Sequence, residues 1–362
     1  MKVLMTTDTV GGVLTHTTEL IGGLRDQADV VVATMGTPLQ ESQRTALLAA
    51  GAADVYDGGY ALEWMADPWD DVAVAGEWLL ELAAQERPDV VHLNGYAHAA
   101  LPWEVPCLVV GHSCVLSWWR AVHGEAAPGV WDRYRAVVRE GLQAADVVVA
   151  PTGYMLSELQ DLYGGWPGQA WVIPNGSSQV VGTSPKAPFV LAAGRMWDEA
   201  KNLSSLDRAA AGLAWPVLAA GPLNPPSQSA PPVRPRSVWP LGELEPSELA
   251  EWRQQAAVFA APALYEPFGL AILEAAVDRC ALVLGDIPSL RELWDGAARF
   301  VDPHDHASLH FTLKELIGDP GQREQLGRRA QRRAQRYVAS AMSERYHELY
   351  ASLLVHAGAL SS

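Results

Sequence analysis

The sequence alternates short apolar strand patterns with longer amphipathic helical patterns, and this alternation limits the possible folds more than any other feature. Continuous runs of valine, leucine and isoleucine are typical of parallel strands that are covered on both faces. In the first half, such runs predict strands at Lys2–Met5, Asp29–Thr34, Val90–Leu93, Cys107–Gly111, Asp146–Ala150 and Trp171–Ile173. The helical patterns between them are Thr15–Arg25, Val72–Glu86 and Ala126–Ala144. This order of elements predicts a doubly wound α/β domain.

The alternation restarts after a polar, proline-containing segment at residues 181–188, which predicts a linker between two domains. Further strands are predicted at Phe189–Ala193, Pro216–Ala220, Val258–Ala261 and Ala281–Leu284. Helices are predicted at Lys201–Gly212, Pro246–Ala256, Gly269–Val277, Ala307–Ile317 and along Gln322–Leu354, and a surface loop at Gly221–Pro240. We therefore expect an N-terminal domain at residues 1–180, a C-terminal domain at 189–335, and a last helix at 336–362 that packs back toward the N-terminal domain. Two α/β domains of similar size joined by a short linker would place the carboxyl ends of their sheets face to face. Because open α/β sheets bind ligands at that edge, we expect the site in the cleft between the domains.

The charge of the chain disfavours several classes of partner. Its 362 residues contain 26 lysines and arginines against 42 acidic residues, a net charge of −16. Such a protein is repelled by nucleic acid and by anionic membrane surfaces, so we expect no nucleic-acid partner and no strong membrane association. The imbalance lies in the first 180 residues, with 8 basic and 22 acidic residues, whereas the remainder has 18 and 20. The second half therefore tolerates an anionic ligand better than the first.

Cysteine content and hydropathy indicate the cellular compartment. The three cysteines, Cys107, Cys114 and Cys280, are too few and too scattered for a disulfide framework or a zinc cluster, and they fit a reducing environment. No apolar run approaches the roughly 18 residues of a membrane span, and the N-terminus resembles a strand rather than a leader peptide. We expect a full-length cytoplasmic protein.

The segment Glu266–Glu274 follows a predicted strand and opens a helix. Gly269 would let a ligand approach the backbone closely, and the amides of Phe268, Gly269 and Leu270 would lie at the positive end of the helix dipole. The two carboxylates, eight residues apart, suit hydrogen bonding to vicinal hydroxyls of a sugar or ribose. Taken singly, Glu266 is also explained as a helix cap and Glu274 as a residue on an exposed helix face.

A second group of residues lies at the end of the strand Phe189–Ala193. Gly194 and Arg195 follow this strand, and Lys201 opens the next helix. Two cations at a strand–loop–helix corner would hold a diphosphate, although an arginine at a strand end is often a salt-bridge partner. Together with the glutamate pair, they predict a site for a nucleotide sugar.

The first half offers weaker candidates at the ends of its predicted strands. Gly11 and Gly12 turn the chain tightly after the first strand, and either an anion site or a plain turn explains them. The absence of Gly-x-Gly-x-x-Gly and Gly-Lys-Ser/Thr disfavours dinucleotide oxidoreductases and P-loop NTPases. His112 follows the strand Cys107–Gly111. Possible contacts to an acceptor are His16, Asn94, Tyr96, Trp118 and Trp119, and core packing explains the two tryptophans nearly as well.

The sequence resembles family 4 of the retaining glycosyltransferases over nearly its whole length. The Glu-x7-Glu motif of that family matches Glu266 and Glu274, and its Gly-Arg…Lys pattern matches Gly194, Arg195 and Lys201. Two further stretches, Ile173–Gly176 and Asp286–Glu292, are also similar. The resemblance implies the GT-B fold, in which two Rossmann-like doubly wound domains face each other across a cleft. One departure is Arg279, which stands where family members usually carry glycine after the helix.

The resemblance also implies roles for these residues. Arg195 and Lys201 would hold the donor diphosphate, Glu274 the ribose, and Glu266 the donor sugar. His112 would contact that sugar near the reacting carbon. Further donor contacts would come from Gly11, Gly12, Leu244, Phe268, Gly269 and Leu270.

The implied reaction is transfer of a sugar from a nucleotide-diphosphate sugar, with uridine as the expected base, to an acceptor hydroxyl with retention of configuration. No Asp-x-Asp triplet occurs, so we expect no metal and no other cofactor, with Arg195, Lys201 and helix dipoles neutralising the leaving group. The acidic first half predicts an acceptor that is neutral or cationic, or a small glycan. Two alternatives stay open: a nucleotide-sugar epimerase of similar build, and a non-catalytic protein that binds nucleotide sugars.

Overall fold

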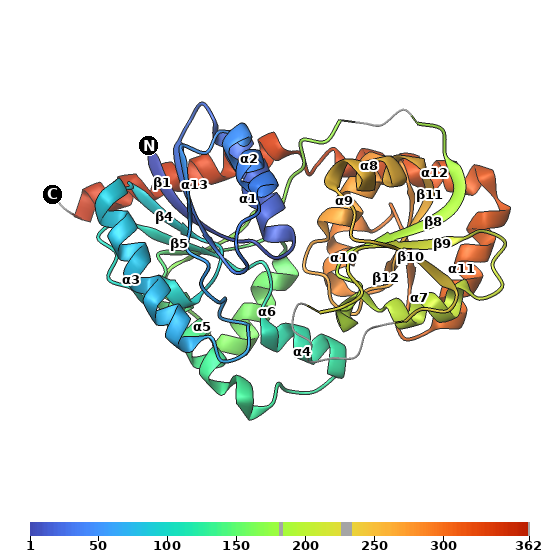
Figure 1. Ribbon diagram of the computed structural model, residues 1–362, viewed down its shortest axis with the longest axis horizontal. Coiled ribbons are helices and arrows are strands. Elements are labelled where there is room, and N and C mark those ends of the chain that lie inside the picture. The colour runs from blue at the N-terminus through green and yellow to red at the C-terminus, as the bar shows by residue number, and fades with distance from the viewer. Residues whose placement is uncertain (181–183, 226–233, 361–362) are drawn as a thin grey trace. The chain divides into compact units, whose positions relative to one another are not determined.

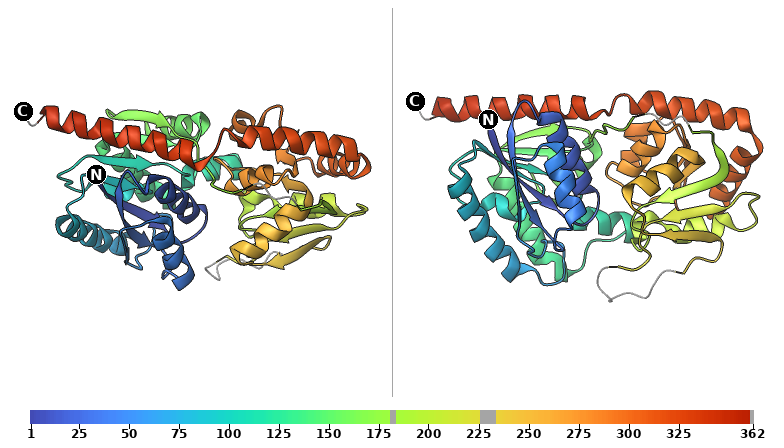
Figure 2. Two further views of the ribbon diagram at one scale, coloured as in Figure 1. Left: turned by 90° about the horizontal axis from the view of Figure 1, so that it is seen from above. Right: turned by 45° about the horizontal axis from the view of Figure 1, so that its top comes forward.

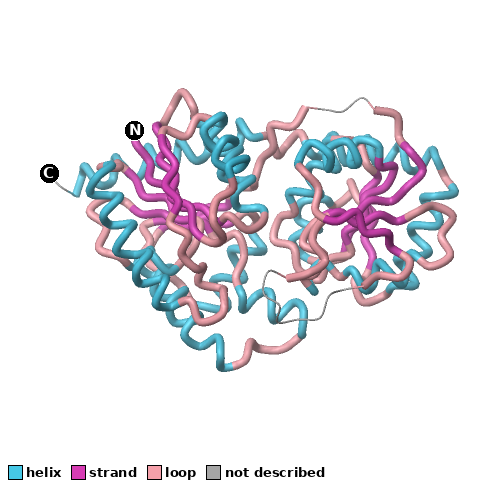
Figure 3. Tube along the Cα trace, in the orientation of Figure 1, coloured by secondary structure: helices cyan, strands magenta, loops and turns pink. Residues whose placement is uncertain are grey.

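The computed structural model describes residues 1–180, 184–225 and 234–360. The described chain forms two compact units. The N-terminal unit contains Met1–Arg120 and Glu125–Ser178, together with the chain from Val338 onward. The C-terminal unit contains Ala121–Gly124 and the described part of Gln179–Tyr337. In both, a parallel sheet carries helices on its two faces (Figure 3).

The sheet of the N-terminal unit has the strand order β3-β2-β1-β4-β5-β6-β7, with all described pairs parallel. Its strands are β1 (Lys2–Asp8), β2 (Asp29–Met35), β3 (Asp54–Asp57), β4 (Val90–Leu93), β5 (Cys107–Val110), β6 (Val147–Ala150) and β7 (Gln169–Val172). The order of the strands reverses between β1 and β4. In open α/β sheets the loops leave a crevice at the carboxyl ends of the two strands that flank such a reversal.

Both faces of this sheet are buried, because successive side chains of a strand point to opposite sides. In β1, Val3 and Met5 belong to the core under the first of the two helix layers, and Leu4 belongs to the core under the second. The first layer contains α1 (Gly12–Leu24), α2 (Glu41–Ala50) and α13 (Ala339–Leu360). The second layer contains α3 (Trp69–Glu86), α5 (Asp132–Ala144) and α6 (Gly153–Tyr163), and α4 spans Val115–His123.

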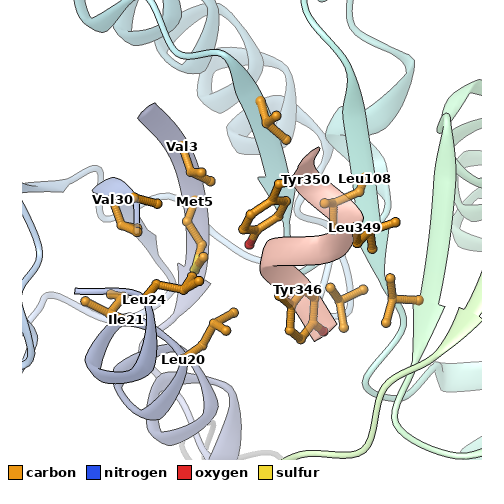
Figure 4. Packing of buried hydrophobic residues seen from close by; sticks show 14 of the residues in the cluster. Val3, Met5, Leu20, Ile21, Leu24, Val30, Leu108, Tyr346, Leu349 and Tyr350 are labelled. Carbon is orange, nitrogen blue, oxygen red and sulfur yellow. The ribbon is translucent and has the colours of Figure 1, made fainter. Parts of the chain in front are cut away.

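The last helix of the chain completes the core of the N-terminal unit. Figures 1 and 2 show α13 alongside α1, although the two helices lie at opposite ends of the sequence. Tyr346 and Tyr350 of α13 are fully buried and pack with Met5 of β1 and Leu108 of β5 (Figure 4). The N-terminal unit therefore includes the end of the chain.

The sheet of the C-terminal unit repeats the arrangement, with the order β10-β9-β8-β11-β12-β13 and all described pairs parallel. Its strands are β8 (Ala187–Ala193), β9 (Val217–Ala220), β10 (Val238–Gly242), β11 (Ala256–Ala261), β12 (Ala281–Gly285) and β13 (Arg299–Val301). Helices α7 (Leu203–Ala210) and α11 (His306–Gly318) cover one face. The other carries α9 (Leu270–Val277), α10 (Pro288–Trp294) and α12 (Pro320–Ala334), with α8 (Pro246–Gln255) packed beside α9. The order reverses between β8 and β11.

The structure confirms the expected two-domain α/β fold and corrects several boundaries. The helix expected at Ala126–Ala144 begins at Asp132, after a short 3-10 turn. The stretch Gln322–Leu354 is two helices, α12 and α13, interrupted at residues 335–338. Of the expected linker, residues 181–183 lie outside the described residues, and Ala187 already belongs to β8.

The loop expected at Gly221–Pro240 is shorter, because β10 begins at Val238; residues 226–233 of that loop lie outside the described residues. Pro240 is compatible with a strand here because β10 is at the edge of its sheet, where a missing N–H costs no ladder hydrogen bond. Among the described helices, none combines the length and the apolar character that crossing a membrane requires.

Candidate functional site

The loops that follow β8 and β11 lie where the strand order of the C-terminal sheet reverses. Gly194 and Arg195 come directly after β8, and Glu266 lies between β11 and α9. The carboxyl ends of parallel strands share one edge of the sheet, so these loops are neighbours. The sequence prediction placed its two groups of residues at this edge, and the structure brings members of both groups into contact.

That contact is an ion pair between Lys201 and Glu266. The Nζ atom of Lys201 lies 2.5 Å from Oε2 of Glu266. Both side chains are mostly buried, with 23% and 16% of their surface exposed. Because the two residues come from different strand–helix connections, the pair joins the loop after β8 to the loop after β11.

Backbone and side-chain hydrogen bonds hold Lys201 in place. It ends a 3-10 turn, at whose start the carboxylate of Asp198 accepts a hydrogen bond from the amide of Ala200 at 3.0 Å. The next residue, Asn202, has a left-handed φ of 56°, and its side-chain nitrogen Nδ2 donates to the carbonyl oxygen of Pro262 at 2.9 Å. The amide of Leu264 also donates to the carbonyl of Ala200. The loop that carries Lys201 is thus tied to the loop that leads to Glu266.

Gly269 sets the start of α9 beside Glu266. Its φ is +87°, and a Cβ atom there would lie 2.8 Å from Cδ1 of Ile272 and 3.2 Å from Cγ of Glu266. Any other residue would therefore be strained and crowded. The first amides of a helix have no acceptor within that helix, so Gly269 and Leu270 present donors at this point. The ring of Phe268 is buried in the core, and only its backbone could serve a ligand.

Close backbone packing also shapes the end of β8. Gly194 has a φ of +147°, and a Cβ atom at Gly221 would lie 1.9 Å from the carbonyl oxygen of Gly194. Arg195 is 40% exposed, its Nη2 lies 3.2 Å from Oδ2 of Asp198, and its guanidinium lies over the ring of Trp197. Arg195 therefore forms the salt bridge that was the alternative explanation for an arginine at a strand end, and its side chain is still accessible to solvent.

Glu274 lies two turns further along α9 and is held by an arginine that sequence analysis missed. Its Oε2 accepts a hydrogen bond from Nη1 of Arg253 at 2.8 Å, and Arg253 also binds Asp278 and Gln179. Glu274 is 24% exposed and Arg253 only 7%. No motif marks Arg253, which lies in α8. Leu244, expected beside the base, is half-buried in the loop between β10 and α8.

The corresponding reversal in the N-terminal unit lies between β1 and β4. Gly11, with a φ of +100°, is the N-cap residue of α1 in the loop after β1, and both Gly11 and Gly12 are exposed. Asn94 follows β4, and its side-chain nitrogen donates to the carbonyl oxygen of Thr6 in β1 at 2.8 Å. His112 follows β5. The three strand ends place these residues along one edge.

Asn94 connects two histidines. Because its nitrogen donates to a carbonyl, its Oδ1 faces the histidines and accepts their hydrogen bonds. Nε2 of His112 lies 2.7 Å from this oxygen and Nε2 of His92 lies 3.3 Å from it, so both nitrogens carry the proton. The hydroxyl of Tyr350 then donates to Nδ1 of His92 at 2.6 Å. The network leaves Nδ1 of His112 unprotonated, as an acceptor.

The imidazoles of this cluster are uncharged at neutral pH. Burial lowers the pKa of His16 to about 4 and that of His92 to about 3. The pKa of His112 is held well below its usual value by burial and by the neighbouring His16 and His92. His112 is therefore a neutral hydrogen-bonding group with one free acceptor position.

Two of the side chains that were expected to contact an acceptor are buried in the structure, which argues against that role for them. His16 is 1% exposed and packs edge-on against His112, while Tyr96 is 3% exposed and its hydroxyl donates to the carbonyl of Ser113. Because neither side chain exposes surface to a ligand, both can act only by packing against residues of the candidate site. Trp118 and Trp119 keep partial exposure in α4.

Sequence analysis also missed Glu63, which lies under the loop after β4. Its carboxylate accepts hydrogen bonds from the amides of Tyr96 and Ala97, the latter at 2.6 Å. Burial raises the pKa of Glu63 to about 7. A lone glutamate in an irregular segment carries no spacing signal, so only the three-dimensional contacts reveal it.

Comparison with known proteins relates both units to enzymes that transfer sugars. The family model described as Glycosyltransferase Family 4 matches residues 10–177, and the model described as Glycosyl transferases group 1 matches residues 236–333. The alpha-maltose-1-phosphate synthase of Mycolicibacterium smegmatis is 27% identical over 90% of this chain and 92% of its own. The D-inositol 3-phosphate glycosyltransferase of Kineococcus radiotolerans is 31% identical over 58% of each chain.

Solved structures show the same fold at low sequence identity. Sucrose-phosphate synthase from Thermosynechococcus elongatus superposes with a TM-score of 0.81 at 18% identity, covering 98% of this chain and 100% of that one. HepE from Anabaena, in complex with UDP-glucose, superposes with a TM-score of 0.76 at 16% identity, covering 97% and 100%.

Proposed function

The chain is a glycosyltransferase of the GT-B fold similar to family 4, and from this premise we propose that it transfers a sugar from a UDP-sugar to an acceptor hydroxyl, with retention of configuration and without a metal ion. The observation that carries the proposal is the Lys201–Glu266 pair at the reversal of the C-terminal sheet. It sets a cation for phosphate beside a carboxylate for sugar hydroxyls, at the start of a helix. The donor base rests on the complex of HepE with UDP-glucose.

The basic residues at this edge provide the means to hold a diphosphate. A lysine ammonium has three donors, so Lys201 can keep its bond to Glu266 and still donate to a phosphate oxygen. The exposed fork of Arg195 supplies a second cation, and the amides of Gly269 and Leu270 supply neutral donors. As the bond to the nucleotide breaks, negative charge grows on the diphosphate, and fixed positive groups lower the barrier.

Transfer with retention requires the acceptor to attack on the face from which the diphosphate leaves. The acceptor oxygen forms a bond to the anomeric carbon on the face from which the diphosphate leaves, while the bond from that carbon to the phosphate oxygen breaks. The acceptor hydroxyl gives its proton to the departing phosphate oxygen, so no protein base is needed. Glu266 then positions the sugar.

The test is a donor and acceptor screen on the wild-type protein. We expect release of the nucleoside diphosphate and formation of a glycoside with the anomeric configuration of the donor, at equal rates with and without excess EDTA. Inverted product or loss of activity in EDTA would contradict the stereochemistry or the metal independence, respectively. Incubation with the nucleotide sugar alone tests the first alternative, an epimerase, because that enzyme would convert the donor without an acceptor. Donor binding without turnover across the whole acceptor panel would favour the second, a non-catalytic binding protein.

The proposal extends to the acceptor and the compartment. The 22 acidic residues against 8 basic ones before residue 181 favour a neutral or cationic acceptor, or a small glycan. The names of both sequence relatives refer to phosphorylated compounds, so the panel includes phosphorylated sugars as the opposing case. Co-sedimentation with anionic vesicles would count against this acceptor class. The three free, buried cysteines support a cytoplasmic enzyme.

A further inference from the structure

A pocket of about 500 Å³ lies at the edge of the C-terminal sheet opposite to Lys201 and Glu266. Its walls include Ala187 at the start of β8, Ala257 near the start of β11, and Trp215, which precedes β9. In a parallel sheet the strand starts share one edge and the strand ends the other, so this pocket is separate from the donor edge. Its volume lies within the range of sites for small molecules.

Three basic side chains line the pocket: Lys186, Arg279 and Arg323. The ammonium of Lys186 donates to the carbonyl of Gln254 at 2.8 Å, and Nη1 of Arg323 donates to the carbonyl of Ile317 at 2.9 Å. Within the described chain, no carboxylate lies within 4.0 Å of Lys186 or Arg323, although Asp319 acts electrostatically on Arg323 from further away. Two acidic residues, Asp278 and Glu324, also line the pocket, so its three cations leave a net positive charge. In a protein with a net charge of −16, such a group favours an anionic ligand.

Arg279 reaches the pocket from a strained position. It follows α9 with a φ of +63°, a left-handed conformation that glycine adopts freely and that other residues adopt only at a cost. Its side chain is 42% exposed, and its guanidinium is only loosely paired, with Nη2 3.9 Å from Oε1 of Glu324. Glycine would adopt this backbone conformation with less strain, so the presence of arginine here indicates a functional role for its side chain.

Asp278 also lines the pocket and carries a buried acceptor oxygen. Its side chain is fully buried, and Oδ2 is bound by Arg253 and Gln179, each at 2.7 Å. Its Oδ1 has no hydrogen-bond partner among the described residues. Leaving a buried charged acceptor unsatisfied is costly, and a ligand hydroxyl would satisfy it.

We propose that this pocket binds a small phosphorylated polyol. Its phosphate would contact Lys186 and Arg279, with Arg323 adding positive charge, and one of its hydroxyls would donate to Oδ1 of Asp278. The cations alone would accept any compact anion; the unsatisfied carboxylate oxygen adds the requirement for a hydroxyl.

Calorimetric titration of the full-length protein tests this proposal, with glycerol 3-phosphate, inorganic phosphate and glycerol as probes. We expect saturable binding of glycerol 3-phosphate, weaker binding of phosphate, and none of glycerol. The double variant Lys186→Gln/Arg279→Asn removes two cations, and asparagine tolerates the left-handed backbone. It should weaken glycerol 3-phosphate binding at least tenfold, whereas Lys314→Gln/Arg332→Gln, which removes the same charge from exposed positions, should not.

Two further titrations separate this site from the donor edge. Lys201→Gln should leave glycerol 3-phosphate binding unchanged, and the pocket double variant should leave UDP binding unchanged. Each of three results would overturn the proposal. These are no saturable binding of glycerol 3-phosphate to the wild type, equal binding of it by the pocket variant and the wild type, and its complete displacement by UDP. None of these outcomes depends on whether the protein transfers sugars, so the proposed function is judged separately.

Discussion

Replacing Lys201 with glutamine tests the donor site most directly. In the wild type, the ammonium of Lys201 lies 2.5 Å from the carboxylate of Glu266. Glutamine removes the positive charge but keeps a side-chain N–H that can still donate to Glu266. The substitution therefore separates the charge on the diphosphate from the local structure of the two loops. The exposed Lys314, changed to glutamine in the same unit, is the matched control.

The expected magnitude follows from the burial of the pair. A hydrogen bond to a charged group contributes about 1.5–3 kcal/mol when its site is largely desolvated, which corresponds to a loss of about 13-fold to 160-fold in kcat/KM. Most of this loss should fall on kcat, because the charge on the leaving diphosphate grows only as the bond breaks. Stability should change by less than about 1 kcal/mol, since Lys201 keeps partial exposure and glutamine retains the contact to Glu266.

Steady-state kinetics with varied donor, alongside thermal unfolding, measures both quantities. The cycle of Lys201→Gln, Glu266→Gln and the double variant should show coupling of at least about 0.5 kcal/mol in the activation free energy, because the two side chains are in contact. The reasoning would be refuted if Lys201→Gln stayed within threefold of the wild type in kcat/KM with its thermal transition unchanged. A loss that Lys314→Gln shares would also refute it.

Three further changes probe other parts of the structure. Asn94→Ala removes the acceptor that fixes the proton on His112 and should lower kcat about tenfold or more, which initial rates measure; ¹⁵N spectra should show His112 populating both tautomers, and a single unchanged tautomer would contradict the network. Burial raises the pKa of Glu63 to about 7, so the folded state favours the protonated carboxyl. The contribution of this proton to the free energy of unfolding is complete below the unfolded pKa of about 4.5 and is lost as the pH rises through 7. Urea unfolding at pH 5 to 8 should therefore show the wild type losing about 1–3 kcal/mol relative to Glu63→Gln, and a difference independent of pH would be inconsistent with the buried carboxyl. Gly269→Ala should cost at least about 2 kcal/mol and reduce activity, whereas Gly296→Ala, at a similar φ of +76° with open space around its Cβ, should cost only about 1–2 kcal/mol and leave activity intact; equal effects would remove the steric argument.

The sequence predicted the central strands well because a parallel strand covered on both faces is a continuous apolar run. Edge strands lack that signal: β3, Asp54–Asp57, has acidic residues at both ends and was not predicted. The break between α12 and α13 was missed because residues 335–338 contain neither glycine nor proline, and helical spacing continues across them.

At the candidate site, local patterns predicted Lys201, Glu266 and Gly269, whose spacing and loop position are visible in the sequence. The partners that hold such residues were not visible, because a contact between distant positions leaves no spacing to detect. Arg253 meets Glu274 across 21 residues, and Tyr350 meets His92 across 258.

The bond from Tyr350 to His92 explains why the last helix belongs to the N-terminal unit. His92 lies in β4, the central strand beside the reversal, and is fully buried, so each of its ring nitrogens needs a partner. Asn94 serves one nitrogen, and the hydroxyl of Tyr350 in α13 serves the other. The same helix covers the apolar face of β1 with Tyr346 and Leu349 (Figure 4). Because Tyr350 donates to Nδ1 of His92, the proton of His92 lies on Nε2 and is donated to Oδ1 of Asn94. The same oxygen accepts the proton of His112, so the last helix helps to set the hydrogen-bonding state of a residue at the candidate site.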